Sequence, residues 1–253
     1  VVGSLPQALK KQGIEVRVVL PKYNQIPDFY KSEMETIQEL KVSVNWRNQY
    51  CGVEKLVYEG ITYYFIDNRY YFYRGDIYSF LDEAERFVYF NRAVLEMLPY
   101  LEFTPDIIHC HDWHTGILSV FLDNDYQEYC QKKTVFTVHN LKYQGIFPCE
   151  IMGELLELGP EYFTRESLEY YGNVNFLKGG LQFSDVITTV SKTYAEEIQT
   201  STYGEGLEGV LQSRKQDLNG IINGLDYDKY NPATDKHIHI NYKNSFSKKQ
   251  ENK

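Results

Sequence analysis

Cysteine is scarce in this sequence, and the few cysteines suggest no covalent framework. Cys51, Cys110, Cys130 and Cys149 stand far apart without a Cys-x-x-Cys pair. Their spacing therefore indicates neither a zinc ribbon nor a set of disulfides. We interpret them as four reduced thiols and expect a cytoplasmic protein.

Long apolar runs and an excess of positive charge are also lacking. No stretch approaches the ~20 consecutive apolar residues that a membrane span needs. The 35 acidic residues outnumber the 26 basic ones and give a formal net charge of -9. Negative charge disfavours binding to a nucleic-acid backbone or to an anionic membrane surface. We expect no membrane and no nucleic acid among the partners.

Apolar and aromatic side chains, in contrast, are plentiful. Apolar residues make up 43% of the 253 residues, which is ample for the core of one large domain or two small ones. Tyrosine occurs 23 times and clusters at positions 63–64 and 70–73. These rings either fill sheet faces and half-buried surfaces or stack on sugars or bases, and both readings stay open.

The first third of the chain predicts a helix followed by strands. A helix over 1–13 should end at Gly13, directly before a strand over 14–21. Because the chain opens inside a helix, we expect the natural sequence to begin earlier. Strands at 41–46, 52–60 and 61–67, with a turn at Gly60, predict an antiparallel hairpin insert that decorates the main sheet.

Helices and strands then alternate. The apolar stripe of Phe87, Phe90, Val94, Met97 and Leu101 predicts a helix over 82–101. Strands are expected at 106–110, 133–138, 185–190 and 218–222. Helices are expected at 114–124, 191–200 and 206–213, and a long loop and helices through 151–183. Strands without polar alternation, separated by helices, favour a parallel sheet covered on both faces. We predict a doubly wound α/β fold.

Polar residues follow each of these four strands. The stretches are HCHDWHTG (109–116), HNLKYQG (139–145), SKTYAEE (191–197) and NGLDYDKYNP (223–232). Ligands of doubly wound folds bind at the carboxyl ends of the strands. Four such stretches that converge on one edge predict a single functional site.

Two enzyme classes can be weighed at this edge. His111, His114 and His139 could supply three nitrogens to a catalytic zinc. The neighbouring strand ends, however, offer Asn140, Ser191 and Asn223 instead of further carboxylates, and amides and hydroxyls are poor metal anchors. A metal-dependent hydrolase therefore remains only as an alternative.

A serine or cysteine nucleophile is disfavoured. The G-x-S-x-G pattern is absent, and Ser191 fits better as the N-cap of the helix that follows it. Cys110 should be buried within its strand. We therefore expect no nucleophilic catalysis by these residues.

The same side chains suit a ligand covered with hydroxyl groups. A sugar needs flat hydrogen-bonding groups at its rim and an aromatic surface against its C–H face. The strand ends supply Asp112, His114, His139, Asn140 and Gln144, interleaved with the rings of Trp113, Tyr143 and Tyr78. A single histidine after a strand could equally cap a helix, but the convergence of the set favours a sugar site.

Seven segments in this order resemble the bacterial glycogen synthase and plant starch synthase family. They are VVGSLPQALKKQG (1–13), YFYRGDIYSFLDEAERFVYFNRA (71–93), PDIIHCHDWHTG (105–116), VFTVHNLKYQGIFP (135–148), FLKGGLQFSDVITTVSKTYAEEIQT (176–200), YGEGLEGVL (203–211) and NGLDYDKYNPATD (223–235). The resemblance covers nearly the whole chain. Members of this family are retaining glucosyltransferases that use ADP-glucose or a related nucleotide sugar.

The resemblance implies the N-terminal half of a two-domain GT-B-type glycosyltransferase. Two Rossmann-like domains face each other across a cleft; the N-terminal one mainly carries the glucan acceptor and the C-terminal one mainly holds the nucleotide. We expect residues 1–235 to form the acceptor-side domain and 236–253 to begin the linker to an absent C-terminal domain. Family members open with a first strand and a K-T-G-G-L-like loop, and this chain starts just after that loop.

The family's site residues carry over to specific positions. The resemblance assigns His139 to the donor glucose and its developing positive charge, and Asp112 and Asn140 to glucose hydroxyls. Asn223 matches a residue near the same sugar, and Tyr78 matches an aromatic residue of the cleft. Trp113, His114, Tyr143 and Gln144 are expected to line the cleft.

The implied reaction transfers glucose from ADP-glucose to the 4-hydroxyl of an α-1,4-glucan, with retention at the anomeric carbon and without a metal or other cofactor. The expected partners are the glucan acceptor, the nucleotide sugar and the C-terminal domain of the same parent chain. Because the phosphate-binding cations belong to that domain, we expect residues 1–253 to be inactive alone. The alternative is a noncatalytic glucan-binding module.

Overall fold

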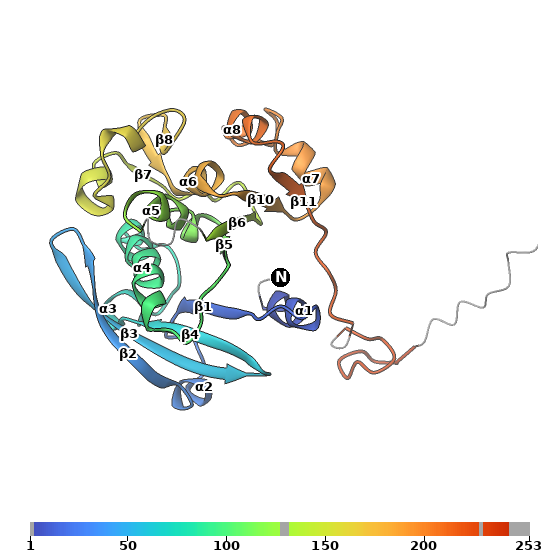
Figure 1. Cartoon of the computed structure of the whole chain (residues 1–253). Helices are drawn as coiled ribbons and strands as arrows, with labels where there is room; N and C mark the ends of the chain where they lie inside the picture. The colour runs from blue at the N-terminus through green and yellow to red at the C-terminus, as the bar shows by residue number, and fades with distance from the viewer. Residues whose placement is uncertain (1–2, 127–131, 228–229, 243–253) are drawn as a thin grey trace, which may run out of the picture.

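The strands form two four-stranded sheets and a smaller third sheet (Figure 1). The computed structural model describes residues 3–126, 132–227 and 230–242. The first sheet has the order β1-β4-β3-β2 and comprises β1 (Arg17–Pro21), β4 (Ile61–Asp67), β3 (Arg47–Tyr58) and β2 (Glu35–Val44). β1 runs parallel to β4, and the β4–β3 and β3–β2 pairs are antiparallel. Gly60 closes the β3–β4 hairpin at a φ of 73°, which a residue without Cβ adopts without strain.

The second sheet is entirely parallel and has the order β11-β10-β6-β5. Its strands are β5 (Ile107–His111), β6 (Lys133–Val138), β10 (Val186–Thr189) and β11 (Leu218–Gly220). His111, the last residue of β5, pairs with Thr137, the second-last residue of β6, so these two strands end side by side. All four carboxyl ends therefore face the same edge of this sheet, as the sequence predicts.

A small antiparallel sheet follows the second strand of the parallel sheet. It consists of β7 (Ile146–Pro148), β9 (Asn173–Asn175) and β8 (Glu169–Tyr170). A π-helical turn at 152–156 and a 3-10 turn at 160–162 lie between β7 and β8, and α6 (Phe176–Phe183) follows β9. The prediction of only a loop and helices through this segment was wrong, because its strands are too short to show a period-two pattern.

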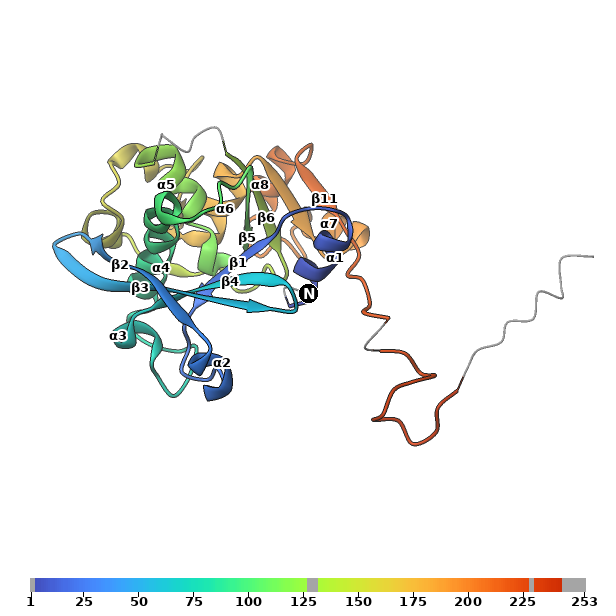
Figure 2. The same ribbon diagram turned by 60° about the horizontal axis from the view of Figure 1, so that its bottom comes forward.

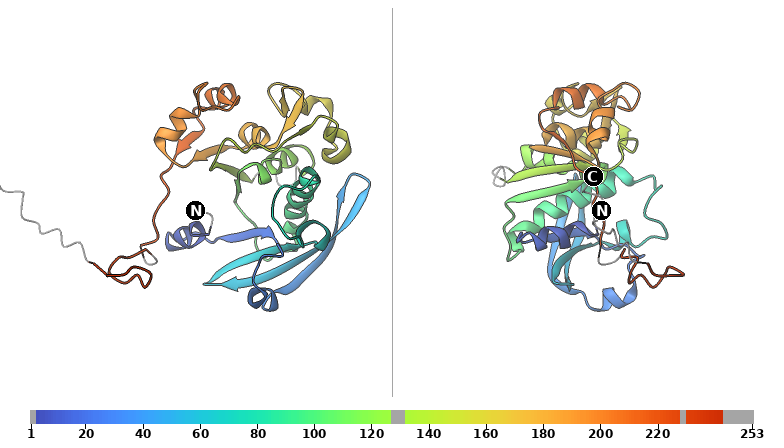
Figure 3. Two further views of the ribbon diagram at one scale, coloured as in Figure 1. Left: turned by 180° about the vertical axis from the view of Figure 1, so that it is seen from behind. Right: turned by 90° about the vertical axis from the view of Figure 1, so that its right-hand side faces the viewer.

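Helices join the sheets through one hydrophobic core. α4 (Glu83–Met97) packs against β2 and against α5 (Leu118–Asn124). It lies between the first sheet and α5 in Figures 1 and 3. Its stripe of Phe87, Phe90, Val94 and Met97 is buried, as predicted. Pro99 lies in a 3-10 turn at 98–100 and ends the α-helix early, since proline lacks an N–H donor.

The remaining helices lie at the periphery. They are α1 (Leu5–Lys11), α2 (Asp28–Ser32), α3 (Arg69–Phe72), α7 (Lys192–Glu197) and α8 (Glu208–Ser213). Ser191 caps α7, because its side chain accepts a hydrogen bond from the N–H of Tyr194 at 2.9 Å. After β11 the chain leaves the body of the domain (Figure 2). The boundary expected at residue 235 stays a prediction, and 243–253 lie outside the described residues.

The predicted α/β class, with a parallel sheet and an antiparallel hairpin, is confirmed, but the strands are divided differently. We expected the hairpin to decorate a single sheet. Instead, β2 and β3 join the parallel β1–β4 pair, and these four strands form a sheet that is separate from the parallel sheet. Within the described residues, no backbone hydrogen-bond ladder joins β1 to β5. The second sheet therefore carries the four strand ends that the sequence singled out.

The cysteines and the apolar helices can be checked directly. Cys51 and Cys110 are buried free thiols and Cys149 is an exposed one, while Cys130 lies outside the described residues. No helix in 3–126, 132–227 or 230–242 is long and apolar enough to cross a membrane.

Candidate functional site

The ends of β5 and β6 are tied together by one side chain. Oδ1 of Asp112, the first residue after β5, accepts a hydrogen bond from the backbone N–H of His139 at 2.8 Å. Asp112 has a φ of 57°, which is uncommon for a residue with a side chain. Its own N–H donates to the carbonyl of Thr137 at 3.0 Å, so the turn is held from both sides. These two hydrogen bonds hold Asp112 in its strained backbone conformation.

Two histidines meet at this turn. Nδ1 of His111 lies 3.1 Å from Nε2 of His139, and the rings of His109 and His111 stack with centroids 4.2 Å apart. Burial lowers the pKa of His109 to about 4 and that of His111 to about 3. Both rings are therefore neutral at pH 7, and each neutral imidazole offers one N–H donor and one acceptor nitrogen. The half-buried carboxyl of Asp112 lies beside them. Desolvation raises its pKa, and the hydrogen bond from the N–H of His139 partly offsets that effect.

His114 does not join the other two histidines. The His114 ring stacks on the Trp113 ring, with centroids 4.0 Å apart. The centroid of the Tyr78 ring lies 5.4 Å from that of His114. Burial, and then the charge of Arg86, lower the pKa of His114 to about 4. In the part of the chain that the structure describes, no group of three or more His, Cys, Asp or Glu side chains is arranged to hold a metal ion.

The candidate residues divide into exposed and buried groups. Tyr78 is 54% exposed, and Asn140, Tyr143 and Asn223 are exposed as well. Oδ1 of Asn140 accepts from the N–H of Lys142 at 3.1 Å, which shapes the turn after β6. Within the described residues, no hydrogen bond links Asn223 to Asp112 or His139. The structure thus brings Asp112, His111 and His139 of the β5 and β6 ends into direct contact.

Trp113 and Gln144, which were expected to line the cleft, are buried side chains. Trp113 is 7% exposed, and its ring packs against Phe147 and His114. Gln144 is 6% exposed, and both ends of its amide are occupied: Nε2 donates to the carbonyl of Glu205 at 3.0 Å, and Oε1 accepts from Nδ2 of Asn175 at 2.6 Å. These two side chains hold the loop after β6 in place.

The partners of Gln144 were not predicted from the sequence. Asn175 caps α6 through the N–H of Lys178, and the Tyr170 hydroxyl donates to the same Glu205 carbonyl at 2.8 Å. Glu205 itself has a φ of 50°. The sequence signal for this network is Gly206, which directly follows Glu205. Gly206 adopts a φ of 80°, and a Cβ at this position would overlap the Tyr170 hydroxyl.

Gly145 lets the loop after β6 close over Trp113, so its replacement should be costly. It has a φ of 62°, and a Cβ at this position would overlap the Trp113 ring. We expect Gly145→Ala to lower the free energy of unfolding by about 3 kcal/mol, from overpacking and backbone strain together. The measurement is urea unfolding. Gly153→Ala is the control, because a Cβ there meets nothing within 4 Å, and equal stability of the two variants would contradict the packing argument.

Comparisons with known proteins agree with one another. A family model described as the starch synthase catalytic domain matches residues 1–213. The chain is 54% identical to a glycogen synthase of Desulforamulus reducens over 100% of this chain and 54% of the relative. It is 55% identical to a glycogen synthase of Anoxybacillus flavithermus over 96% of this chain and 51% of the relative. The chain therefore spans about half the length of these curated relatives.

A solved structure has the same fold. It is the catalytic domain of starch synthase IV from Arabidopsis thaliana, bound to ADP and acarbose. Its TM-score against this chain is 0.84 at 32% sequence identity, and the match covers 96% of this chain and 51% of that one. The fold is thus shared with a protein whose structure contains ADP and acarbose.

Proposed function

We propose, because this chain belongs to the starch synthase catalytic domain family, that it forms the acceptor-side half of a retaining glucosyltransferase. The full protein would transfer glucose from ADP-glucose to the 4-hydroxyl of an α-1,4-glucan. Its partners would be the glucan, the nucleotide sugar and the C-terminal domain of the same parent chain. The free thiols and the bacterial relatives support a cytoplasmic location.

The observation that carries this proposal is the tightly held imidazole pair of His111 and His139 at the ends of β5 and β6. His139 is fixed at its backbone by Asp112 and at its ring by His111. A preorganised hydrogen-bonding group costs no reorganisation when charge develops on the substrate. We therefore assign the His139 ring to the donor glucose, where positive charge develops as the transition state becomes oxocarbenium-like.

The other half of the reaction needs a different wall. The departing phosphate gains negative charge, which arginine and lysine side chains stabilise. The candidate site residues named above are instead imidazole, amide, carboxylate and aromatic groups, and Lys142 and Lys192 of the same stretches are not among them. We therefore assign the phosphate-binding cations to the C-terminal domain. We assign no metal to the site, because its strand ends offer amides where further carboxylates would be needed.

A glucan-binding module without catalysis is the second candidate, and the exposed rings of Tyr78 and Tyr143 favour it for this chain in isolation. Aromatic faces stack on the C–H surface of a sugar without any turnover. The two candidates share the same binding surface. They differ in whether the complete protein transfers glucose.

Binding of a short glucan tests the surface itself. We expect residues 1–253 to bind maltotriose with a Kd of about 1 mM, because shallow aromatic and polar contacts give little surplus over the cost of association. The measurement is an NMR titration of this chain with maltotriose and, separately, with ADP. Tyr78→Ala should weaken maltotriose binding at least several-fold.

Tyr100 offers a matched control for Tyr78. Both rings are 54% exposed, but Tyr100 follows the opposite end of α4. Tyr100→Ala should leave the affinity unchanged. Equal affinities for the Tyr78→Ala and Tyr100→Ala variants would mean that the sugar does not bind at the proposed surface.

A further inference from the structure

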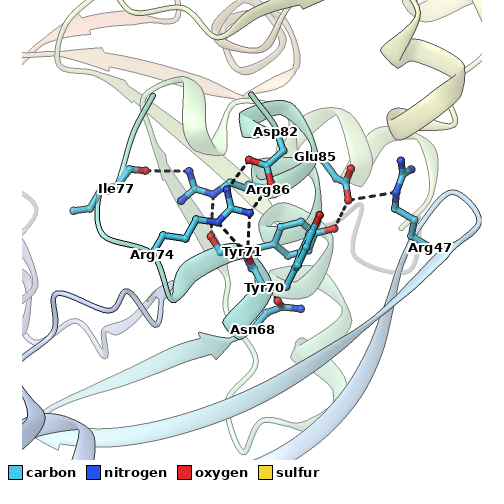
Figure 4. A network of polar contacts seen from close by, with 9 residues as sticks. All are labelled: Arg47, Asn68, Tyr70, Tyr71, Arg74, Ile77, Asp82, Glu85 and Arg86. Carbon is cyan, nitrogen blue, oxygen red and sulfur yellow. Dashed lines mark hydrogen bonds and ion pairs between the residues drawn. The ribbon is translucent and has the colours of Figure 1, made fainter. Parts of the chain in front are cut away.

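Arg86 is a fully buried cation beneath the loop that carries Tyr78. It lies in the first turn of α4 and is 0% exposed. Its Nε donates to the carbonyl of Tyr71 at 3.0 Å, and its Nη1 donates to the carbonyl of Ile77 at 3.0 Å (Figure 4). Nη2 has no hydrogen-bond partner among the described residues. The guanidinium thus bridges α3 and the residue directly before Tyr78.

Burial of the Arg86 charge costs desolvation free energy. A buried charge is tolerated when it is paired, yet in 3–126, 132–227 and 230–242 no carboxylate lies within ion-pair distance of Arg86. The nearby Asp82 is bound in a bidentate pair by Arg74, at 2.7 and 2.6 Å. Burial lowers the pKa of Arg86, and the charge of Arg74 lowers it further. A residue that served only to fill the core would be apolar.

The loop between α3 and α4 is held in a strained shape at this point. Ser79, the residue after Tyr78, has a φ of 71°, and its N–H donates to Oε1 of Glu83 at 2.5 Å. The Phe80 ring lies 4.8 Å from the Arg74 guanidinium and 4.9 Å from that of Arg86. The two cations therefore flank one ring, and the backbone on either side of Tyr78 is fixed by a separate contact.

The anchor on α3 is itself fixed. The Tyr71 hydroxyl donates to Glu85 at 2.5 Å, and Nε of Arg47 lies 3.4 Å from the same Glu85 oxygen, as Figure 4 shows. The Asn68 side chain caps α3 by accepting from the N–H of Tyr71 at 3.1 Å. Arg86 therefore connects Ile77 to a segment that cannot shift easily.

We propose that Arg86 is a positioning residue for glucan binding. By holding the Ile77 carbonyl it fixes the backbone beside Tyr78, and it keeps the Tyr78 ring against His114 as a preformed face for the acceptor. This inference rests on the proposed function, because it assigns Tyr78 to the acceptor. A preorganised ring loses less conformational entropy when the glucan binds than a mobile one would. Loss of the clamp should therefore weaken the acceptor and leave the donor unaffected.

The test uses a chimera in which this chain replaces the matched residues of the D. reducens glycogen synthase. Arg86→Lys keeps the cation but loses the planar fork that reaches both carbonyls. We expect the KM for a malto-oligosaccharide acceptor to rise about tenfold, as for the loss of one binding contact, with the KM for ADP-glucose unchanged. An unchanged acceptor KM, or an equal rise of both KM values, overturns the proposal.

Arg92 supplies a matched control on the same helix. It is 8% exposed, donates to the carbonyl of Leu156 at 2.9 Å and forms ion pairs with Asp125 and Glu157. Arg92→Lys should destabilise a buried arginine site of the same kind without touching the Tyr78 loop. A rise in acceptor KM with Arg92→Lys equal to that with Arg86→Lys would show a general structural effect and overturn the assignment.

Hydrogen exchange separates this inference from the proposed function. In Arg86→Lys the amides of 73–82 should exchange faster, whereas Arg92→Lys should leave them unchanged. Unchanged exchange over 73–82 overturns the role of Arg86, and this readout needs no transfer activity. If a folded wild-type chimera transferred no glucose, the proposed function would fail while the exchange data still judged the clamp. Should Arg86→Lys not fold, Phe80→Leu removes the ring between the two arginines and must raise the same acceptor KM and the same exchange.

Discussion

Replacing His139 with alanine in the chimera should lower turnover by roughly 10² to 10³-fold, while the protein still folds. The imidazole is held by His111 at 3.1 Å and by Asp112 through the backbone. With the role that we propose for His139, we expect its loss to remove one transition-state contact worth ~3 kcal/mol. The measurement is the rate of radiolabelled glucose transfer from ADP-glucose at saturating substrates, with circular dichroism to verify the fold.

His109 is the control for this prediction. It stacks on His111, but its Nε2 lies 2.6 Å from the Thr137 hydroxyl and not against His139. His109→Ala should therefore cost much less turnover than His139→Ala. A near-normal rate for His139→Ala, or a variant that does not fold, would defeat the assignment of His139.

Residues 1–253 alone should show no glucose transfer, and this is the largest effect that we expect. Stabilising the sugar and neutralising the departing phosphate must occur at the same instant, and we assign the two tasks to opposite walls of a cleft. One wall can bind a glucan weakly but cannot lower the barrier. The assay incubates this chain with radiolabelled ADP-glucose and maltotriose, beside the chimera as a positive control.

Two results would contradict that division of labour. Transfer above background by this chain would mean that the C-terminal domain is dispensable. Tight ADP binding in the NMR titration would place the nucleotide site on this half of the protein. Weak maltotriose binding without either result is the expected outcome.

The parallel sheet was predictable because its short strands alternate with helices along the chain. β6 has the same bounds as the predicted strand at 133–138, and β5 and β10 begin within one residue of their predicted starts. The position of the site at the strand ends follows from the parallel topology alone. The three-stranded sheet of β7, β9 and β8 was not predictable, since strands of two or three residues carry no periodic signal.

The direction of individual side chains was harder to predict than their place in the chain. Trp113 and Gln144 occur in the expected stretches, but the positive φ of Gly145 folds the loop over the tryptophan and buries both side chains. A glycine in the sequence indicates a turn, but it does not tell which side chains the loop covers. Arg86 was missed for another reason: a charge at the start of a helix is normally solvated, and only the tertiary fold puts the Tyr71 and Ile77 carbonyls around it.

The central claim is that the strand-end site of this chain works as half of a glucosyltransferase active site, and one measurement tests it most directly. The chimera is incubated with ADP-glucose labelled in its glucose and with glycogen, and the linkage and anomeric form of the product are analysed. We predict transfer of labelled glucose to the 4-hydroxyl of chain ends as an α-linked residue. A folded chimera that binds maltotriose but transfers no label, or that forms a β-linked product, would contradict the account.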